Sequence, residues 1–353
     1  AQPLQVGERE IFPTASVGVA ICDSRHETGE QLLGEADIAL RVAKNGGGDR
    51  KDWTQGVIGN FSSGFTQGTV GFGVDAYGEW GIKLDGGAGT AGTGNLPVDR
   101  HGDPEDEYGT AGGAIKMRIS KTELRYGDLM PTAPVFAAGG SRLFSQTATG
   151  FNLLSSDIAG LELDGGHFTG GNGPVTTNHD HDIYASYAGV TASSIDYAGG
   201  KYTFNDNLTA SLYGSNLKDV WDQYYGNLNY TQGITDNQSV NFDFNIYRTN
   251  DAGSAKAGDI SNTTWSLAAA YSFLTAHTLT LAYQKVHGDT PFDYVAFGIN
   301  GPGDTADSIF VANSVQYSDF NGPGEKSWQA RYDLNMASYG VPGLSFMARY
   351  ITG

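Results

Sequence analysis

The feature that most limits how this chain can fold is an alternation of apolar and polar residues with a period of two. The clearest example spans residues 264–273, whose apolar members are Trp265, Leu267, Ala269, Tyr271 and Phe273. Successive side chains of a β-strand point to opposite faces, so such a segment has one apolar face and one polar face. Repeated over about three hundred residues, the pattern predicts a membrane β-barrel with lipid outside and water inside.

The alternation recurs along most of the chain, for example at residues 240–246, 278–284 and 327–336. Some neighbouring segments are joined by very short links, at residues 205–207, 275–277 and 339–343. Other links are long, at residues 85–109, 126–160 and 287–326. Short turns at one end and long loops at the other are typical of outer-membrane barrels. We therefore expect an all-β fold with about thirteen or fourteen antiparallel strands, each near the ~10 residues that a tilted strand needs.

Composition excludes several classes of protein. Hydrophobic residues make up 39% of the 353 residues, and no apolar run is long enough for a spanning helix. The net charge of -18, from 21 basic and 39 acidic residues, argues against nucleic acid as a partner. The one cysteine, Cys22, rules out a disulfide framework and a thiolate metal site in the β portion. The opening residues show no signal-peptide pattern.

The first fifty residues differ from the rest. Residues 11–21 read as a buried strand, and residues 30–48 read as an amphipathic helix that stops at three glycines. The strings "TASVGVA" and "ADIALRVAKNGGGDR" resemble the C-terminal end of a GGDEF (diguanylate cyclase) domain. Arg41 and Gly48 depart from the family pattern, and the signature loop with its metal-binding carboxylates is not found before this segment. We therefore expect residues 1–50 to be a non-functional β-α remnant fused to the barrel.

Four long strings in the β portion carry a second resemblance. Residues 52–78, 131–151, 242–273 and 317–344 resemble the OprD family of outer-membrane porins. The resemblance extends over residues 51–353. It implies a monomeric barrel of about eighteen strands in the outer membrane, which admits small carboxylate-bearing nutrients such as amino acids or aromatic acids. Compared with that family, we expect the chain to lack the first strand and several C-terminal strands, so that the barrel is truncated.

Because alternate residues of a strand point to opposite faces, the sequence predicts which basic residues face the pore. Ile115, Met117 and Ile119 form an apolar face, so Lys116, Arg118 and Ser120 are expected to point inward. The same reasoning adds Lys201, Arg331 and, less clearly because Met347 shares its face, Arg349. A cation on the lipid face destabilises a barrel, so inward placement alone requires no function. The resembling family implies a ladder of such cations leading anions through the pore.

Two of the long links are candidates for the constriction. Link 126–160 shows no strand periodicity, and the family implies that it folds into the lumen with Arg142 at the narrowest point. Link 287–326 supplies Asp293, Tyr294, Tyr317 and Asp319 as an opposing side rich in carboxylates and hydroxyls. The ordinary alternative is that these are solvated extracellular loops.

No catalytic residues, cofactor or metal site are predicted. The string "NHDHD" at residues 178–182 places His179 and His181 on one extended segment, with no second group of ligands in view. We therefore expect a porin that is not an enzyme. Two alternatives stay open at this stage: a diguanylate cyclase remnant, and a water-soluble β-sandwich binding protein.

Overall fold

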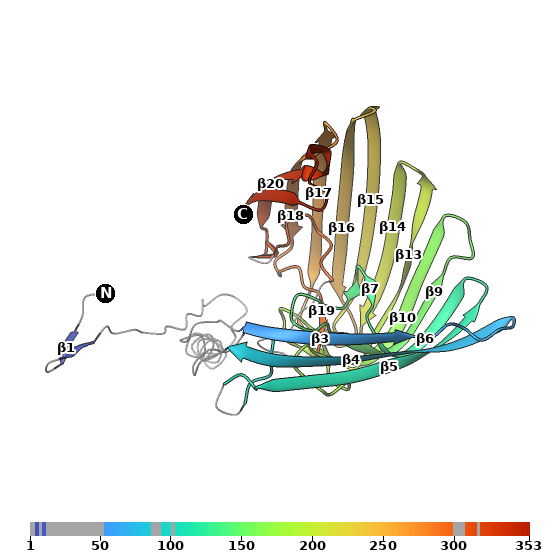
Figure 1. Cartoon of the computed structure of the whole chain (residues 1–353), viewed down its shortest axis with the longest axis vertical. Coiled ribbons are helices and arrows are strands. Elements are labelled where there is room, and N and C mark those ends of the chain that lie inside the picture. The colour runs from blue at the N-terminus through green and yellow to red at the C-terminus, as the bar shows by residue number, and fades with distance from the viewer. Residues whose placement is uncertain are drawn as a thin grey trace.

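The structure, a computed structural model, describes residues 4–6, 9–11, 53–85, 93–99, 103–298, 308–315 and 318–353. Its main element is one antiparallel sheet of 14 strands that follow one another in chain order (Figure 1). The strands are β3 (Trp53–Ser62), β4 (Val70–Asp85), β5 (Glu107–Ile119), β6 (Thr122–Leu129), β9 (Thr147–Ser155), β10 (Leu161–Asn172), β13 (Ile195–Asn205), β14 (Leu208–Leu217), β15 (Trp221–Thr235), β16 (Gln238–Asp251), β17 (Ser261–Phe273), β18 (His277–His287), β20 (Lys326–Asn335) and β21 (Ser345–Thr352). The all-β expectation and the expected number of strands are confirmed.

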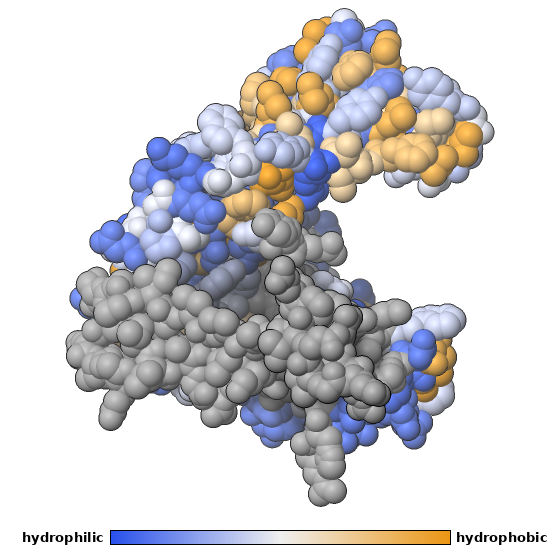
Figure 2. Space-filling view, turned by 90° about the vertical axis from the view of Figure 1, so that its left-hand side faces the viewer, coloured by the Kyte–Doolittle hydropathy of each residue, from blue (hydrophilic) through white to orange (hydrophobic). Residues whose placement is uncertain are grey.

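The sheet curves around an interior. Figure 2 shows a hollow between its two arms, and β3 and β21 form its two edges. Within the described residues, no strand pairing joins these two edges. None of the helices in that part of the chain is long and apolar enough to cross a bilayer. The one helix among the described residues, η1 (Met336–Tyr339), is a short 3-10 helix between β20 and β21.

The period-two pattern places the apolar side chains on the outer face, as expected. On β17, Asn262, Thr264 and Ser266 are buried on the inner face, whereas Leu267 is 42% exposed on the outer face. Because paired residues share a face, Tyr283 on β18 continues the outer surface beside Leu267. A sheet with this arrangement has one face suited to lipid and one suited to water.

The link expected at residues 126–160 is shorter than predicted, because it contains a complete strand. Strand β9 pairs with both β6 and β10 across the sheet. Its alternation is weak because Ala148 and Gly150, two of its buried residues, are small and carry no polar group opposite the exposed Phe151 and Leu153. The true connection is residues 130–146. The short links expected at residues 205–207 and 275–277 are confirmed as tight turns between paired strands, at residues 206–207 and 274–276.

A second layer fills the concave side of the sheet. We call it the inner layer: residues 130–146, 173–194, 288–298, 308–315 and 318–325, which are described parts of three long connections. It contains β7 (Thr132–Ala133), β8 (Phe136–Ala137), β11 (Ile183–Ala185), β12 (Thr191–Ala192) and β19 (Val295–Phe297). Strand β11 pairs with β12 and β19, so two connections share a small sheet. The main hydrophobic cluster lies between this layer and the inner face of the large sheet.

Most of residues 1–50 lie outside the described residues. Only β1 (Leu4–Val6) and β2 (Arg9–Ile11) are described, as a two-stranded antiparallel pair. The strand expected at residues 11–21 and the helix expected at residues 30–48 lie outside the described residues.

Candidate functional site

The inner layer is fixed to the sheet by a buried aromatic cluster. Phe136 is fully buried, with its ring 5.1 Å from that of Phe168, 5.1 Å from that of Phe297 and 6.0 Å from that of Tyr197. These rings come from β8, β10, β19 and β13, so the side chain joins two connections to the sheet. Truncating a buried aromatic side chain to alanine lowers the stability of a protein by roughly 3–5 kcal/mol.

Hydrogen bonds also join these connections to the sheet and to each other. The hydroxyl of Tyr247 on β16 donates to the carbonyl oxygen of Pro134 at 3.0 Å and accepts from the backbone N–H of Phe310 at 2.9 Å. The side-chain amide of Gln146 donates to the carbonyl oxygen of Phe297 at 2.7 Å. Because these groups are buried, each needs its partner, and the connections are therefore held inside the lumen. The expectation that a long connection folds into the lumen agrees with this geometry.

A carboxylate surrounded by hydroxyls lies within the inner layer. The Oδ2 atom of Asp319 accepts hydrogen bonds from the hydroxyls of Tyr187 and Tyr294, both at 2.7 Å. Its Oδ1 atom accepts from Ser314 Oγ at 2.7 Å. We call these four residues the Asp319 cluster. It brings together Tyr294 and Asp319, which the sequence predicted, with Tyr187, which the sequence did not.

Tyr187 could not have been found from local sequence, because it lies more than a hundred residues from Asp319, in a segment with no strand pattern. The nearby Asp293 has a different role from the one predicted. Its carboxylate accepts from the backbone N–H groups of Tyr187, Ala188 and Tyr294, and the side chain is 9% exposed. Burial raises the pKa of Asp293 to about 6, against the lowering effect of these donors. Asp293 therefore positions the tyrosines rather than facing the lumen. Tyr317 lies outside the described residues.

The two cations predicted on β5 point inward but differ in environment. Lys116 is 6% exposed, and its Nζ lies 2.6 Å from Asp75 Oδ1 and 2.8 Å from Ser62 Oγ. Arg118 is exposed, and its guanidinium lies 4.2 Å from the ring centre of Phe65. Stacking of this kind holds a guanidinium in place without neutralising it. Of the two, only Arg118 is exposed, whereas Lys116 is buried and its charge is paired.

The other predicted cations are distributed around the sheet. Lys201 is exposed on β13 and is paired in register with Glu162 of β10. Arg331 makes a two-point contact with Asp333, with N–O distances of 2.8 and 2.7 Å. Arg349 is the register partner of Arg331, so both arginines share the inner face. The sequence left the face of Arg349 uncertain, and the register places it.

Arg142 and Ser120 both lie outside the strands, Arg142 in a connection and Ser120 in a turn. Arg142 is exposed, and the neighbouring Phe144 is buried against Tyr108 of β5 at 5.8 Å between ring centres. It therefore belongs to the end of its connection that contacts the sheet near β5. Ser120 lies in the turn after β5 with a φ of 55°, and its hydroxyl donates to Asp157 Oδ1 at 2.5 Å. Ser120 is thus a turn residue and does not continue the row formed by Lys116 and Arg118.

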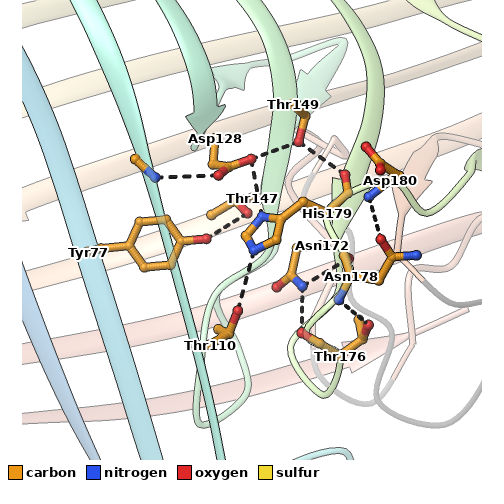
Figure 3. Close-up of polar contacts among 11 residues, drawn as sticks. Tyr77, Thr110, Asp128, Thr147, Thr149, Asn172, Thr176, Asn178, His179 and Asp180 are labelled. Atoms are coloured by element: carbon orange, nitrogen blue, oxygen red, sulfur yellow. Dashed lines mark hydrogen bonds and ion pairs between the residues drawn. The ribbon is translucent and has the colours of Figure 1, made fainter.

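His179 of "NHDHD" holds its connection against the sheet (Figure 3). His179 Nδ1 is buried and lies 3.1 Å from Asp128 Oδ1, off the line of a hydrogen bond, while its Nε2 lies 3.5 Å from Thr110 Oγ1 of β5. The hydroxyl of Thr149 donates to Asp128 at 2.8 Å. His181 Nε2 contacts Thr176 Oγ1 at 2.9 Å within the same connection. In the described ranges, no three His, Cys, Asp or Glu side chains are grouped to hold a metal ion.

A curved antiparallel sheet with an apolar outer face, a polar inner face and connections packed inside it has the architecture of a porin wall. A family model described as outer membrane porin, OprD family, matches residues 35–353. The chain belongs to the OprD family of outer-membrane porins. The match begins at residue 35, inside the segment that resembles a GGDEF domain.

Similar proteins support this assignment. Porin D of Pseudomonas aeruginosa is 67% identical over 313 residues, which cover 89% of this chain and 70% of that protein. A crystal structure of OprD from the same species is 61% identical with a TM-score of 0.73, covering 85% of this chain and 70% of that one. The structure of OpdK from P. aeruginosa with vanillate is 33% identical with a TM-score of 0.77, covering 85% of this chain and 76% of that one. Porins of this family are outer-membrane channels for small solutes and not enzymes.

Proposed function

We propose that this porin takes up small carboxylate-bearing solutes by passive, selective diffusion. The observation that carries the proposal is the position of Arg118 on the inner face, exposed and held over Phe65, with its charge free of an ion pair among the described residues. An anion that loses water in a narrow passage is stabilised by a fixed cation of this kind. Lys201, Arg142 and Arg349, all exposed, extend the positive row.

The Asp319 cluster supplies the other side of the proposed passage. Its carboxylate repels a solute carboxylate, whereas the tyrosines beside it present polar oxygens. A carboxylate solute would therefore keep its charged end toward the cations and its opposite end toward Asp319. The crystal structure of the relative OpdK contains vanillate, an aromatic carboxylate, which agrees with this class of substrate.

The test is the substitution of Arg118 and Arg142 by glutamine, with benzoate as the probe. We expect the double variant to take up benzoate about tenfold more slowly in liposomes, because each lost charge-assisted contact is worth a factor of several. Arg248→Gln is the matched control: this arginine lies on the outer face of β16, bonded to Thr263 and Ser261. Equal uptake by the double variant and the control would refute the proposal.

We also propose that the GGDEF-like remnant takes no part in transport. The proposal rests on the resemblance and on the departures at Arg41 and Gly48. We expect a variant without residues 1–34, the part that precedes the family match, to keep its single-channel conductance in planar bilayers. A lower conductance, or a loss of folded protein on a semi-native gel, would contradict it.

A further inference from the structure

The outer face of the sheet carries a row of aromatic side chains near the long connections. The row crosses β16, β17, β18 and β20, which are neighbours in the sheet (Figure 1), and consists of Phe244, Trp265, Tyr283 and Trp328. Neighbouring ring centres along it are 6.3, 5.4 and 4.5 Å apart, in that order. Leu281, the next outer residue toward the turn at residues 274–276, is 58% exposed. Aromatic rows of this kind mark the level at which a barrel wall leaves the hydrocarbon of the bilayer.

Three cations lie one step beyond the aromatic row on the same face, and we call Arg248, Lys285 and Lys326 the outer cations. Lys285 and Lys326 are direct register partners, and each lies two residues from a member of the row on its own strand. Arg248 of β16 is paired with Thr263 of β17, which also lies two residues from a member of the row. Residues two apart on a strand share a face, so the outer cations continue the outer surface toward the long connections.

The outer cations are held by neutral groups. The guanidinium of Arg248 donates to Thr263 Oγ1 and Ser261 Oγ, both at 3.0 Å. The ammonium of Lys285 donates to the carbonyl oxygen of Gly324. None of the ion pairs formed among the described residues includes an outer cation. The outer face of β16, β17, β18 and β20, all of them described, also carries no aspartate or glutamate, so these positive charges are fixed but not balanced.

The outer cations lie at the end of the sheet where the long connections leave it. Strand β16 continues into residues 252–260, and residues 288–325 join β18 to β20. The opposite ends of these strands meet their neighbours at the short turns 236–237 and 274–276. In outer-membrane barrels the short turns face the periplasm and the long loops face the outside. The outer cations are therefore level with the polar headgroups of the outer leaflet.

We propose that the outer cations form a docking site for the phosphate groups of lipopolysaccharide, the phosphorylated glycolipid of the outer leaflet. Charge complementarity selects this partner, because the cations are gathered on one patch of a chain whose net charge is -18. The guanidinium of Arg248 offers a forked donor to phosphate oxygens, and the two lysines act as point charges. The acyl chains would lie against the aromatic row and the apolar wall below it.

The docking site is independent of the carboxylate proposal, because it lies on the face of the sheet opposite to the pore. The liposomes of the benzoate assay hold no lipopolysaccharide, so Arg248→Gln remains the control there.

The test measures the dissociation constant of lipopolysaccharide from the full chain in detergent. We expect Lys285→Gln/Lys326→Gln to raise it about tenfold, because each cation near an anionic headgroup contributes a factor of several. Lys285→Arg/Lys326→Arg keeps both charges and should change it by less than about twofold. The matched control is Lys121→Gln/Lys218→Gln, which removes two exposed lysines from turns outside these strands and should also change it by less than about twofold.

A second comparison uses the unaltered chain, so it holds even where a variant fails to fold. Lipopolysaccharide stripped of its phosphates should bind about tenfold more weakly, and phosphatidylglycerol and inorganic phosphate should compete poorly at equal phosphate concentration. Equal binding of the stripped lipid would overturn the proposal, as would equal competition by phosphatidylglycerol. An unchanged dissociation constant in the glutamine variant, with its folded band intact on a semi-native gel, would overturn it as well.

Discussion

Replacing Phe136 by alanine should release the inner layer and increase the single-channel conductance. The side chain is fully buried between Phe168 and Phe297, so its removal leaves a cavity and costs about 3–5 kcal/mol of packing. That free energy holds residues 130–146 against the inner face of the sheet, where we propose that they reduce the width of the passage. Conductance rises with the area of the narrowest part, so recordings in planar bilayers measure the effect directly.

Two further variants make this prediction specific. Phe242→Ala removes an aromatic side chain that is 42% exposed on the outer face, and it should leave the conductance unchanged. Tyr247→Phe removes the two hydrogen bonds to Pro134 and Phe310, at a smaller cost of about 1–3 kcal/mol, and should act in the same direction as Phe136→Ala. A normal conductance in Phe136→Ala would show that this connection does not set the width of the passage.

Replacing Lys116 by alanine should lower the stability of the barrel by about 3–5 kcal/mol and leave its anion selectivity nearly unchanged. The ammonium is 6% exposed and paired with Asp75, so its loss leaves the Asp75 carboxylate without a cation. The measurement is the temperature at which the folded band converts to the unfolded band on a semi-native gel. Asp75→Asn in the same chain should restore most of the loss, because it removes the unpaired charge.

Arg118→Gln provides the contrast on the same strand. Its guanidinium is exposed, so we expect little change in unfolding temperature and a clear decrease in anion selectivity, measured as a reversal potential in a salt gradient. If Lys116→Ala instead kept the unfolding temperature and lowered selectivity as much as Arg118→Gln, Lys116 would be a pore cation and not a structural one.

Lys116 and Arg118 show which properties of a residue the sequence predicts and which it does not. Parity placed both side chains on the inner face, because the strand period depends only on local backbone geometry. It could not separate a paired cation from a free one, because Asp75 and Ser62 are 41 and 54 residues away in the chain. Strand β9 was missed for a related reason. Its buried Ala148 packs against the inner layer, and a strand with small residues such as Ala148 and Gly150 at buried positions loses the alternation that identifies it.

The Asp319 cluster depended on tertiary structure in the same way. Tyr294 and Asp319 could be suspected because they lie in one long connection. Tyr187 joins them only because β11 pairs with β19, which brings two connections together. Asp293 could be named from the sequence, but its burial among backbone N–H donors, which makes it a support for the tyrosines, could not.

The sequence by itself determined the class of fold, the outer-membrane family and the inward face of Lys116, Arg118, Lys201 and Arg331, because these follow from a local period and from long matching strings. Only the tertiary structure decided which cations are free, which carboxylates gather hydroxyls and which strand is hidden. The physical reason is that charge pairing and burial depend on groups brought together from distant parts of the chain, whereas the direction of a strand side chain depends on its nearest neighbours.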